Sequence, residues 1–229
     1  MTMLLAAAAA FLAIHLLIAG TGARGAIVGR VGEGPYMGLF SLASAAGLAW
    51  MIFAFGAARQ DPANHVYWTA TTASRHPAVG LVLIAFLFIV PGLLTNTPTR
   101  VMGDNLVDSP NAVSGMTRVT RHPFLWGVAI WAAAHLIVNG RTSDFILFGS
   151  LLALAILGTY SIDAKRMRAL GARYAAFKAQ TSNIPFAAII QGRQTLKIGE
   201  IWWRLLVGLA VWAVVLMGHR AAFGVSPLG

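Results

Sequence analysis

The chain has 229 residues, a formal net charge of +10, and 58% hydrophobic against only 10% charged residues. A soluble domain carries about 25% charged residues, and a protein core cannot take up this much apolar surface, so lipid must cover the outside. The absence of cysteine excludes disulfides, thiolate metal sites, iron–sulfur clusters and covalently attached haem. The basic residues lie between apolar stretches, which favours anionic lipid as a partner and not nucleic acid.

Six apolar stretches predict an all-α fold, a polytopic membrane bundle of about six transmembrane helices that forms one domain over residues 1–229. Several stretches are near the lower limit of about 17 residues for a span, so four or five spans with a re-entrant segment are the alternative. The N-terminus lacks the positive region of a signal peptide, so we expect the first stretch to be retained. The stretches are Met3–Gly20, Met37–Ala58, Ala78–Asn96, Pro123–Asn139, Phe145–Tyr160 and Ile201–Gly218.

The lysines and arginines predict the orientation. If the spans alternate, all but four of the 17 basic residues fall on one side, which the positive-inside rule places in the cytoplasm. We therefore expect a bacterial inner-membrane protein with cytoplasmic basic loops and both termini on the opposite side. The four exceptions are Arg59, Arg75, Arg141 and Arg220.

The longest connection, Asp163–Gly199, lies between the fifth and sixth stretches and is basic. Its first residues predict a helix that continues out of the fifth span, with a break at Gly171. Apolar and basic residues then alternate over Arg173–Lys178, as in a helix that lies in the membrane interface. This amphipathic segment predicts contact with the inner leaflet.

Two of the six histidines, His15 and His135, lie within apolar stretches. Ionisable residues inside a membrane are rare and usually functional, although a neutral imidazole bonded to a neighbouring helix is the alternative. His15 lies roughly 18 Å from the outer end of its span, and His135 roughly 17 Å from the inner end of its own. In a hydrocarbon core of about 30 Å, the two rings would lie at nearly the same level.

Two imidazoles at one level in a helix bundle favour axial ligation of the iron of a b-type haem. Zinc would normally need three or four protein ligands. We therefore expect His15 and His135 to be the axial, metal-binding and catalytic residues, with room for the macrocycle beside Ala132–Ala134. Four arginines are candidates for pairing with the haem propionates: Arg24, Arg30, Arg118 and Arg121.

A third histidine, His122, lies in Arg121-His122-Pro123, directly before the fourth stretch. Proline suits the first turn of a helix, so His122 is predicted to be an interfacial residue at the helix start. It would lie near the propionate side of the haem. The same three residue types recur at Arg75–Pro77, which gives His76 the same interpretation; His65 and His219 are expected to be solvated.

A set of motifs spans nearly the whole chain. They are His15, Gly32–Ser41, Arg121–Pro123, Trp126–Gly127, Trp131, Ala134–His135, Asn139–Gly140, Asp163, Lys165, Gly171, Arg173–Tyr174 and Thr181–Phe186. With these motifs the chain resembles the NnrU family of bacterial membrane proteins, which also includes the plastid and cyanobacterial 15-cis-zeta-carotene isomerases.

The resemblance implies a b-type haem with axial histidines at the positions of His15 and His135. In the isomerases, reduction of the iron is thought to free one ligand so that the iron can act on a polyene double bond. The bacterial branch is named for an association with nitrite and nitric oxide reduction. The expected partners are therefore haem and either an apolar, membrane-soluble substrate or nitric oxide.

A second resemblance rests on Arg121–Pro123 with Gly127, followed by Gly171, Tyr174 and Pro185. These positions look like the small membrane methyltransferases that use S-adenosylmethionine to modify isoprenylcysteine or phospholipids. Those enzymes usually carry acidic residues just before the late Gly-Tyr element, where this chain is mostly basic. A methyltransferase is the alternative function, and a non-catalytic accessory protein of a respiratory enzyme is a third.

Overall fold

The computed structural model describes all residues from 1 to 229, and nearly all regular structure in it is helical. The longer helical elements are α1 (Thr2–Ala13) with the π-helical turn η1 (Ile14–Ile18), α2 (Gly22–Val31), α3 (Glu33–Ala58), α4 (Thr72–Leu94), α6 (Pro123–Val138), α7 (Thr142–Leu170), α8 (Ala172–Gln180) and α10 (Ile198–Phe223). The short elements are β1 (Val66–Thr69), η2 (Asp104–Asp108), α5 (Met116–Val119), β2 (Asn139–Arg141) and α9 (Ala187–Ile190).

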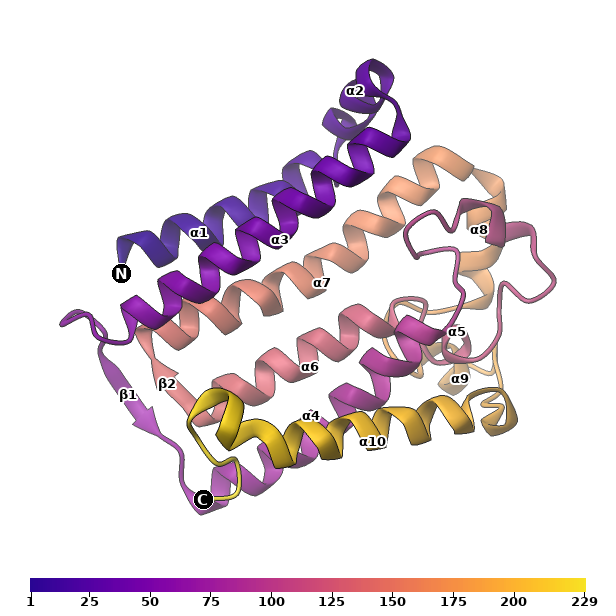
Figure 1. Ribbon diagram of the computed structural model, residues 1–229. Coiled ribbons are helices and arrows are strands. Elements are labelled where there is room, and N and C mark those ends of the chain that lie inside the picture. The colour runs from indigo at the N-terminus through magenta and orange to yellow at the C-terminus, as the bar shows by residue number, and fades with distance from the viewer.

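The long helices run alternately in opposite directions (Figure 1), as short connections between spans require. Both termini lie at one end with β1 and β2, which we call the hairpin end; α2, α5, α8 and α9 lie at the other, the loop end. α6 packs between α4 and α7, α10 covers α4, and α1 packs on α3 and α7. The basic residues predicted to share one side therefore gather at the loop end.

The prediction of an all-α membrane bundle is confirmed, and the count of six spans is approximate. Four helices, α3, α4, α7 and α10, are long and apolar enough to cross a membrane. The first stretch is broken: α1 with η1 meets α2 at an angle of 78°, and the pair gives a fifth span if counted as one. α6 is the sixth apolar helix and has 16 residues.

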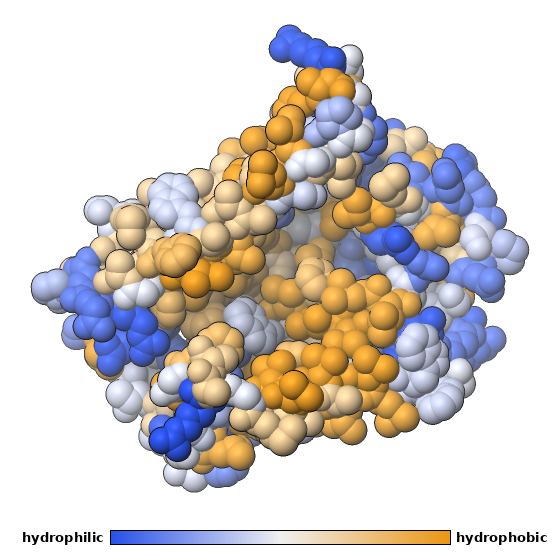
Figure 2. Space-filling model, viewed as in Figure 1, coloured by the Kyte–Doolittle hydropathy of each residue, from blue (hydrophilic) through white to orange (hydrophobic).

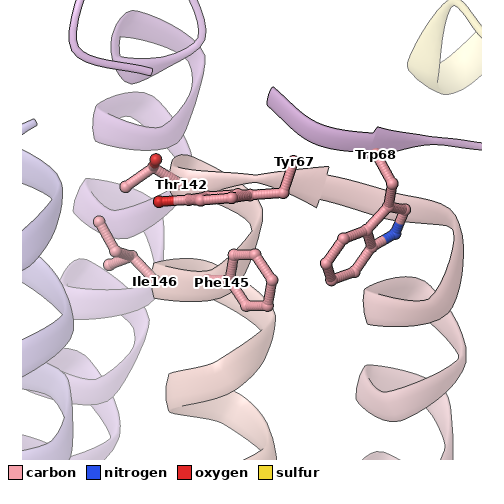
Figure 3. Close-up of a pocket in the computed structure, with 5 residues that line it drawn as sticks. All are labelled: Tyr67, Trp68, Thr142, Phe145 and Ile146. Atoms are coloured by element: carbon pink, nitrogen blue, oxygen red, sulfur yellow. The ribbon is translucent and has the colours of Figure 1, made fainter. Parts of the chain in front are cut away.

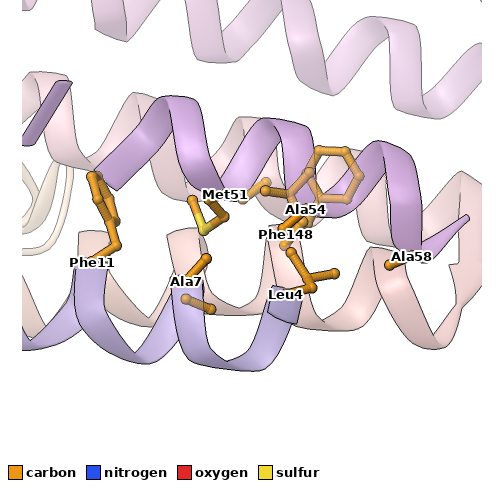
Figure 4. Close-up of a cluster of buried hydrophobic side chains, with 10 residues drawn as sticks. Leu4, Ala7, Phe11, Met51, Ala54, Ala58 and Phe148 are labelled. Carbon is orange, nitrogen blue, oxygen red and sulfur yellow. The ribbon is translucent and has the colours of Figure 1, made fainter. Parts of the chain in front are cut away.

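Apolar side chains cover much of the surface (Figure 2), as contact with lipid requires. Inside, the largest buried cluster joins α1, α3, α6 and α7 (Figure 4). Small residues let these helices approach closely. A Cβ atom on Gly127 would lie 2.6 Å from Cγ1 of Ile89, so only glycine allows α6 its present contact with α4.

The hairpin end carries the two short strands, which pair in antiparallel fashion. Asn139-Gly140, a dipeptide typical of turns, ends the fourth apolar stretch, and both residues belong to β2 because they pair with β1. The indole ring of Trp68 covers Gly140, where a Cβ atom would lie 2.5 Å from the ring. Trp68 and Tyr67 also line an open pocket of about 420 Å³ with Phe145 (Figure 3).

The connection between the last two spans follows the prediction. α7 continues as one helix to Leu170, and Gly171 ends it with a φ of +53°, a left-handed conformation that glycine adopts readily. α8 then places Tyr174 and Phe177 inward, while its other side chains face outward. The amphipathic basic segment is therefore present, and its apolar side packs on the loop end of the bundle.

Candidate functional site

A buried carboxylate, Asp163, accepts hydrogen bonds from three side chains at the loop end. Nε2 of His122 lies 2.8 Å from its Oδ1, and the hydroxyl of Tyr174 donates to the same oxygen at 2.6 Å. Arg121 donates through Nε and Nη2 to Oδ2, at 3.0 and 2.8 Å. A carboxylate can accept this many bonds, and the guanidinium beside it compensates its buried charge. We call these four residues the Asp163 cluster.

The backbone between α5 and α6 positions Arg121 and His122. The backbone N–H of Arg121 donates to the carbonyl of Ser182 at 3.0 Å, and the N–H of Phe186 donates to Val119 at 2.8 Å. These bonds hold the chain after α8 against the start of α6. Pro123 is the first residue of α6, where its missing N–H is not needed. The motif therefore enters the helix with both preceding side chains turned toward α7.

Asn183 extends the network to the neighbouring helices. Its Oδ1 accepts a bond from the indole N–H of Trp126 at 3.2 Å, and its Nδ2 donates to Thr159 Oγ1 at 2.9 Å. The Thr120 hydroxyl donates to its carbonyl. The segment after α8 thereby joins α6 to α7, and every polar group of the Asn183 side chain has a partner.

Burial determines the protonation states of two members of the Asp163 cluster, His122 and Tyr174. It lowers the pKa of His122 below the ordinary value, and the neighbouring Asp163 carboxylate only partly opposes this shift. Burial, together with the same carboxylate, raises the pKa of Tyr174. At neutral pH His122 is therefore uncharged and Tyr174 is a phenol, so both donate a hydrogen bond to Asp163. The cluster is a satisfied network with one carboxylate balanced by Arg121.

The environment of His122 differs from the prediction of an interfacial residue at a helix start. Its side chain is 1% exposed and makes no capping hydrogen bond to α6. Its ring turns instead to Asp163, because α7 extends beyond the predicted span and carries this carboxylate alongside. Asp163 lies in the part of α7 that continues beyond the fifth apolar stretch, as predicted for the first residues of Asp163–Gly199.

His15 lies in η1, the π-helical turn that continues α1. Its Nδ1 lies 2.8 Å from the carbonyl oxygen of Phe11, and its ring packs against the rings of Phe11 and Phe40, at centroid distances of 4.4 and 5.3 Å. Single π-helical turns occur frequently at functional sites. No protein group bonds to Nε2, the nitrogen available to a ligand.

His135 has the same local arrangement in α6. Its Nδ1 lies 2.8 Å from the carbonyl of Trp131, and its ring packs on Trp131 and Phe148, at centroid distances of 4.4 and 4.8 Å. A bond from Nδ1–H to a backbone carbonyl fixes the tautomer whose Nε2 carries a free lone pair. Both histidines therefore present the donor chemistry of an axial metal ligand.

The aromatic rings that pack on the two imidazoles lie at different levels of the bundle. Phe11 and Phe148 belong to one cluster, but Phe148 lies near the level of Leu4 along α1 (Figure 4). Leu4 and Phe11 are about 10 Å apart at 1.5 Å per residue. Two nitrogens on one metal would be about 4 Å apart, given bonds of about 2 Å. The aromatic neighbours of the two imidazoles thus lie about 10 Å apart along the bundle, and ligation of one iron by both histidines stays a prediction.

Three of the four arginines expected beside haem propionates each pair with a carboxylate of the chain. Arg121 binds Asp163, Arg118 donates to Glu200 at 2.9 Å, and Arg24 pairs with Glu33. Arg30 is exposed on α2. None of the three paired guanidinium groups is free for a propionate unless it leaves its partner.

The remaining histidines lie near the surface. His65 is exposed, as predicted. His76, expected at a helix start, is exposed in the first turns of α4. His219 bonds through Nδ1 to the carbonyl of Val225 at 2.9 Å, and it lies within electrostatic range of His135. This proximity was not expected, because His219 and His135 are far apart in the sequence.

Sequence reasoning gave no role to Asp163, Tyr174 and Asn183, although all three belong to the motifs of the family resemblance. The sequence did contain a signal for Asp163, which lies about one turn beyond the fifth apolar stretch. If the helix continues through this residue and buries it, the carboxylate needs a cationic partner. The identity of that partner was not predictable, because it depends on which helices are neighbours.

Together, the apolar helices and the buried Asp163 cluster define a class of small polytopic membrane proteins with a polar network at one end and imidazoles within two of the helices. Residues 3–227 match the family described as NnrU protein, and the chain belongs to this family.

Two curated relatives are both chloroplastic 15-cis-zeta-carotene isomerases. The one from Arabidopsis thaliana is 29% identical over 152 residues, which cover 65% of this chain and 40% of the relative. The one from Zea mays is 31% identical over 116 residues, which cover 49% and 30%. The chain thus matches less than half the length of either relative. No solved structure matches the chain.

Proposed function

We propose that this protein binds b-type haem through His15 and His135 and catalyses cis–trans isomerisation of an apolar polyene. The observation that carries the proposal is the shared arrangement of the two imidazoles. In each, Nδ1 lies 2.8 Å from the carbonyl four residues earlier, Nε2 remains free, and aromatic rings pack on the imidazole. The exposed His76 has the same contact to a carbonyl but no aromatic neighbour. The similarity to two carotene isomerases supports the choice of substrate class.

The residues around the two imidazoles keep water away and hold the rings. Phe11 and Phe40 pack on His15, and Trp131 and Phe148 on His135. A bound haem would supply a redox-active iron in this apolar surrounding. Ligation by both side chains requires the parts of α1 and α6 that carry them to approach each other.

A polyene would reach these residues from the lipid, since apolar side chains cover the outer surfaces of the helices (Figure 2). The location proposed is a bacterial inner membrane, with the basic loop end in the cytoplasm, as the positive-inside rule requires. Anionic lipid would then contact the basic side chains of that end.

The test is the absorbance of the purified protein before and after reduction. Haem binding gives a Soret band, and sharp α and β bands on reduction indicate two axial imidazoles. His15→Ala and His135→Ala should each abolish the low-spin spectrum, while His65→Ala should leave it unchanged. His219→Ala is a further control, because His219 lies near the end of α10 and bonds to the Val225 carbonyl.

A colourless protein that takes up no haem on reconstitution would overturn the proposal. Saturable heat of binding with S-adenosylmethionine, measured by calorimetry, would then favour the methyltransferase alternative. With haem bound, conversion of a cis polyene in lipid nanodiscs, followed by chromatography, distinguishes an isomerase from an accessory protein.

A further inference from the structure

A second group of cations lies at the loop end, between α2, α3 and α7. Lys165 is within electrostatic range of Arg24, Arg168 and the single carboxylate Glu33. Arg24 pairs with Glu33, and Arg168 donates to the carbonyl of Gly20 at 3.2 Å. The ammonium group of Lys165 has no hydrogen-bond or ion-pair partner. Three cations therefore face one carboxylate, which leaves an excess of positive charge.

A buried hydroxyl without a partner lies beside these cations. Tyr36 is 4% exposed, and its hydroxyl makes no hydrogen bond. The guanidinium of Arg24 lies 5.3 Å from the centre of its ring. Burying an unpaired hydroxyl costs free energy, and a phenol next to cations is a suitable donor to an anionic oxygen. The hydroxyl and the cations together present several donors, and Glu33 is the only carboxylate among them.

A row of aromatic rings connects this group to His15. The ring of Tyr36 stacks on Phe40 at a centroid distance of 6.0 Å, and Phe40 packs on His15 at 5.3 Å. The polar group thus lies toward the loop end from the imidazole, with apolar side chains between. An amphipathic ligand near His15 would find charge compensation here for an acidic tail.

We propose that Arg24, Lys165 and the Tyr36 hydroxyl form a binding site for an anionic oxygen group, a carboxylate or a phosphate. Two sources have this chemistry: a propionate of a haem near His15, which rests on the proposed function, and the phosphate of an anionic lipid. Arg118 and Arg121 are not part of this site, because they belong to other contacts: Arg118 pairs with Glu200 on α10, and Arg121 pairs with Asp163 in the buried cluster.

The first arm of the test compares binding of haemin with that of haem dimethyl ester, which has no carboxylates. Lys165→Gln and Tyr36→Phe should each weaken haemin binding about tenfold, as expected for loss of one charge-assisted hydrogen bond, and leave ester binding unchanged. Lys165→Arg should restore haemin binding. Arg30→Gln, which removes an exposed charge from α2, and Tyr160→Phe, on exposed α7 surface, are the matched controls.

The second arm measures thermal midpoints in nanodiscs of phosphatidylglycerol and of phosphatidylcholine. If a lipid phosphate occupies the site, the increase in phosphatidylglycerol should shrink in Lys165→Gln and Tyr36→Phe and persist in the two controls. If the wild-type protein binds no haem, the proposed function is wrong, but this second arm still tests whether the anion site exists. Variants that match the wild type in both arms would overturn the site.

Discussion

Nε2 of His122 lies 2.8 Å from Oδ1 of Asp163, a residue 41 positions later in the chain. This bond joins the start of α6 to the last turns of α7, and Arg121 shares the same carboxylate. The two most noticeable residues of the Arg-His-Pro motif thus serve one buried anion. Their arrangement fixes how α6 enters the bundle, and α6 carries His135.

Replacing Asp163 by Asn should destabilise the protein strongly. The change removes the anion that compensates Arg121 inside the protein, and breaking a buried ion pair from one side costs about 3–5 kcal/mol. We expect a clear fall in the thermal midpoint in detergent, followed by tryptophan fluorescence. Asp108→Asn is the control, because the pair between Asp108 and Arg173 is exposed. Equal effects of the two substitutions would contradict the role given to the Asp163 cluster.

Stability should decrease as the pH falls below about 6.5, the ordinary pKa of histidine. Burial lowers the pKa of His122 in the folded protein, so below pH 6.5 the unfolded chain binds a proton that the folded chain does not. Stability increases with pH wherever the unfolded state binds more protons. His122 therefore gives its full contribution above pH 6.5 and loses it toward the lower folded pKa.

The measurement for this pH dependence is the thermal midpoint of the wild type and of His122→Gln at pH 7.5 and 5.0. The variant should be less stable at pH 7.5, and its midpoint should fall less between the two pH values. Parallel curves for the two proteins would show that another group causes the dependence.

Gly127→Ala should destabilise the contact between α4 and α6. The added Cβ atom would lie 2.6–2.7 Å from atoms of Ile89 and 2.9 Å from the Ala85 carbonyl oxygen, and overpacking of this kind costs about 1–3 kcal/mol. Gly149→Ala, in α7, is the matched control, because nothing lies within 4 Å of its added Cβ atom. Thermal unfolding should give a clearly lower midpoint for Gly127→Ala than for Gly149→Ala.

The orientation can be tested with single cysteines, because the chain has none of its own. Ala179→Cys lies on exposed α8 at the loop end, and Ala63→Cys is exposed at the hairpin end. If the loop end is cytoplasmic, a membrane-impermeant maleimide added to intact bacterial spheroplasts should label Cys at 63 and spare Cys at 179. The reverse pattern would contradict the positive-inside assignment.

The sequence alone predicted the class of fold and most element positions. In lipid every backbone polar group must be satisfied within its own segment, so an apolar run of this length has helix as its main option. Gly171 was predicted as the end of α7 because a left-handed residue there favours glycine. The alternation of spans, read with the basic residues, correctly grouped the charges that gather at the loop end.

What required the tertiary structure was which side chains meet. The partners of Asp163 come from α5–α6 and α8, and no periodicity in the sequence indicates which helix lies beside α7. The depths of His15 and His135 in the bundle also depend on the residue at which each helix begins and on the π-helical turn η1 that contains His15. Composition and hydropathy predict each helix separately, because a helix satisfies its backbone hydrogen bonds internally. Contacts between side chains of different helices depend on how the whole bundle packs.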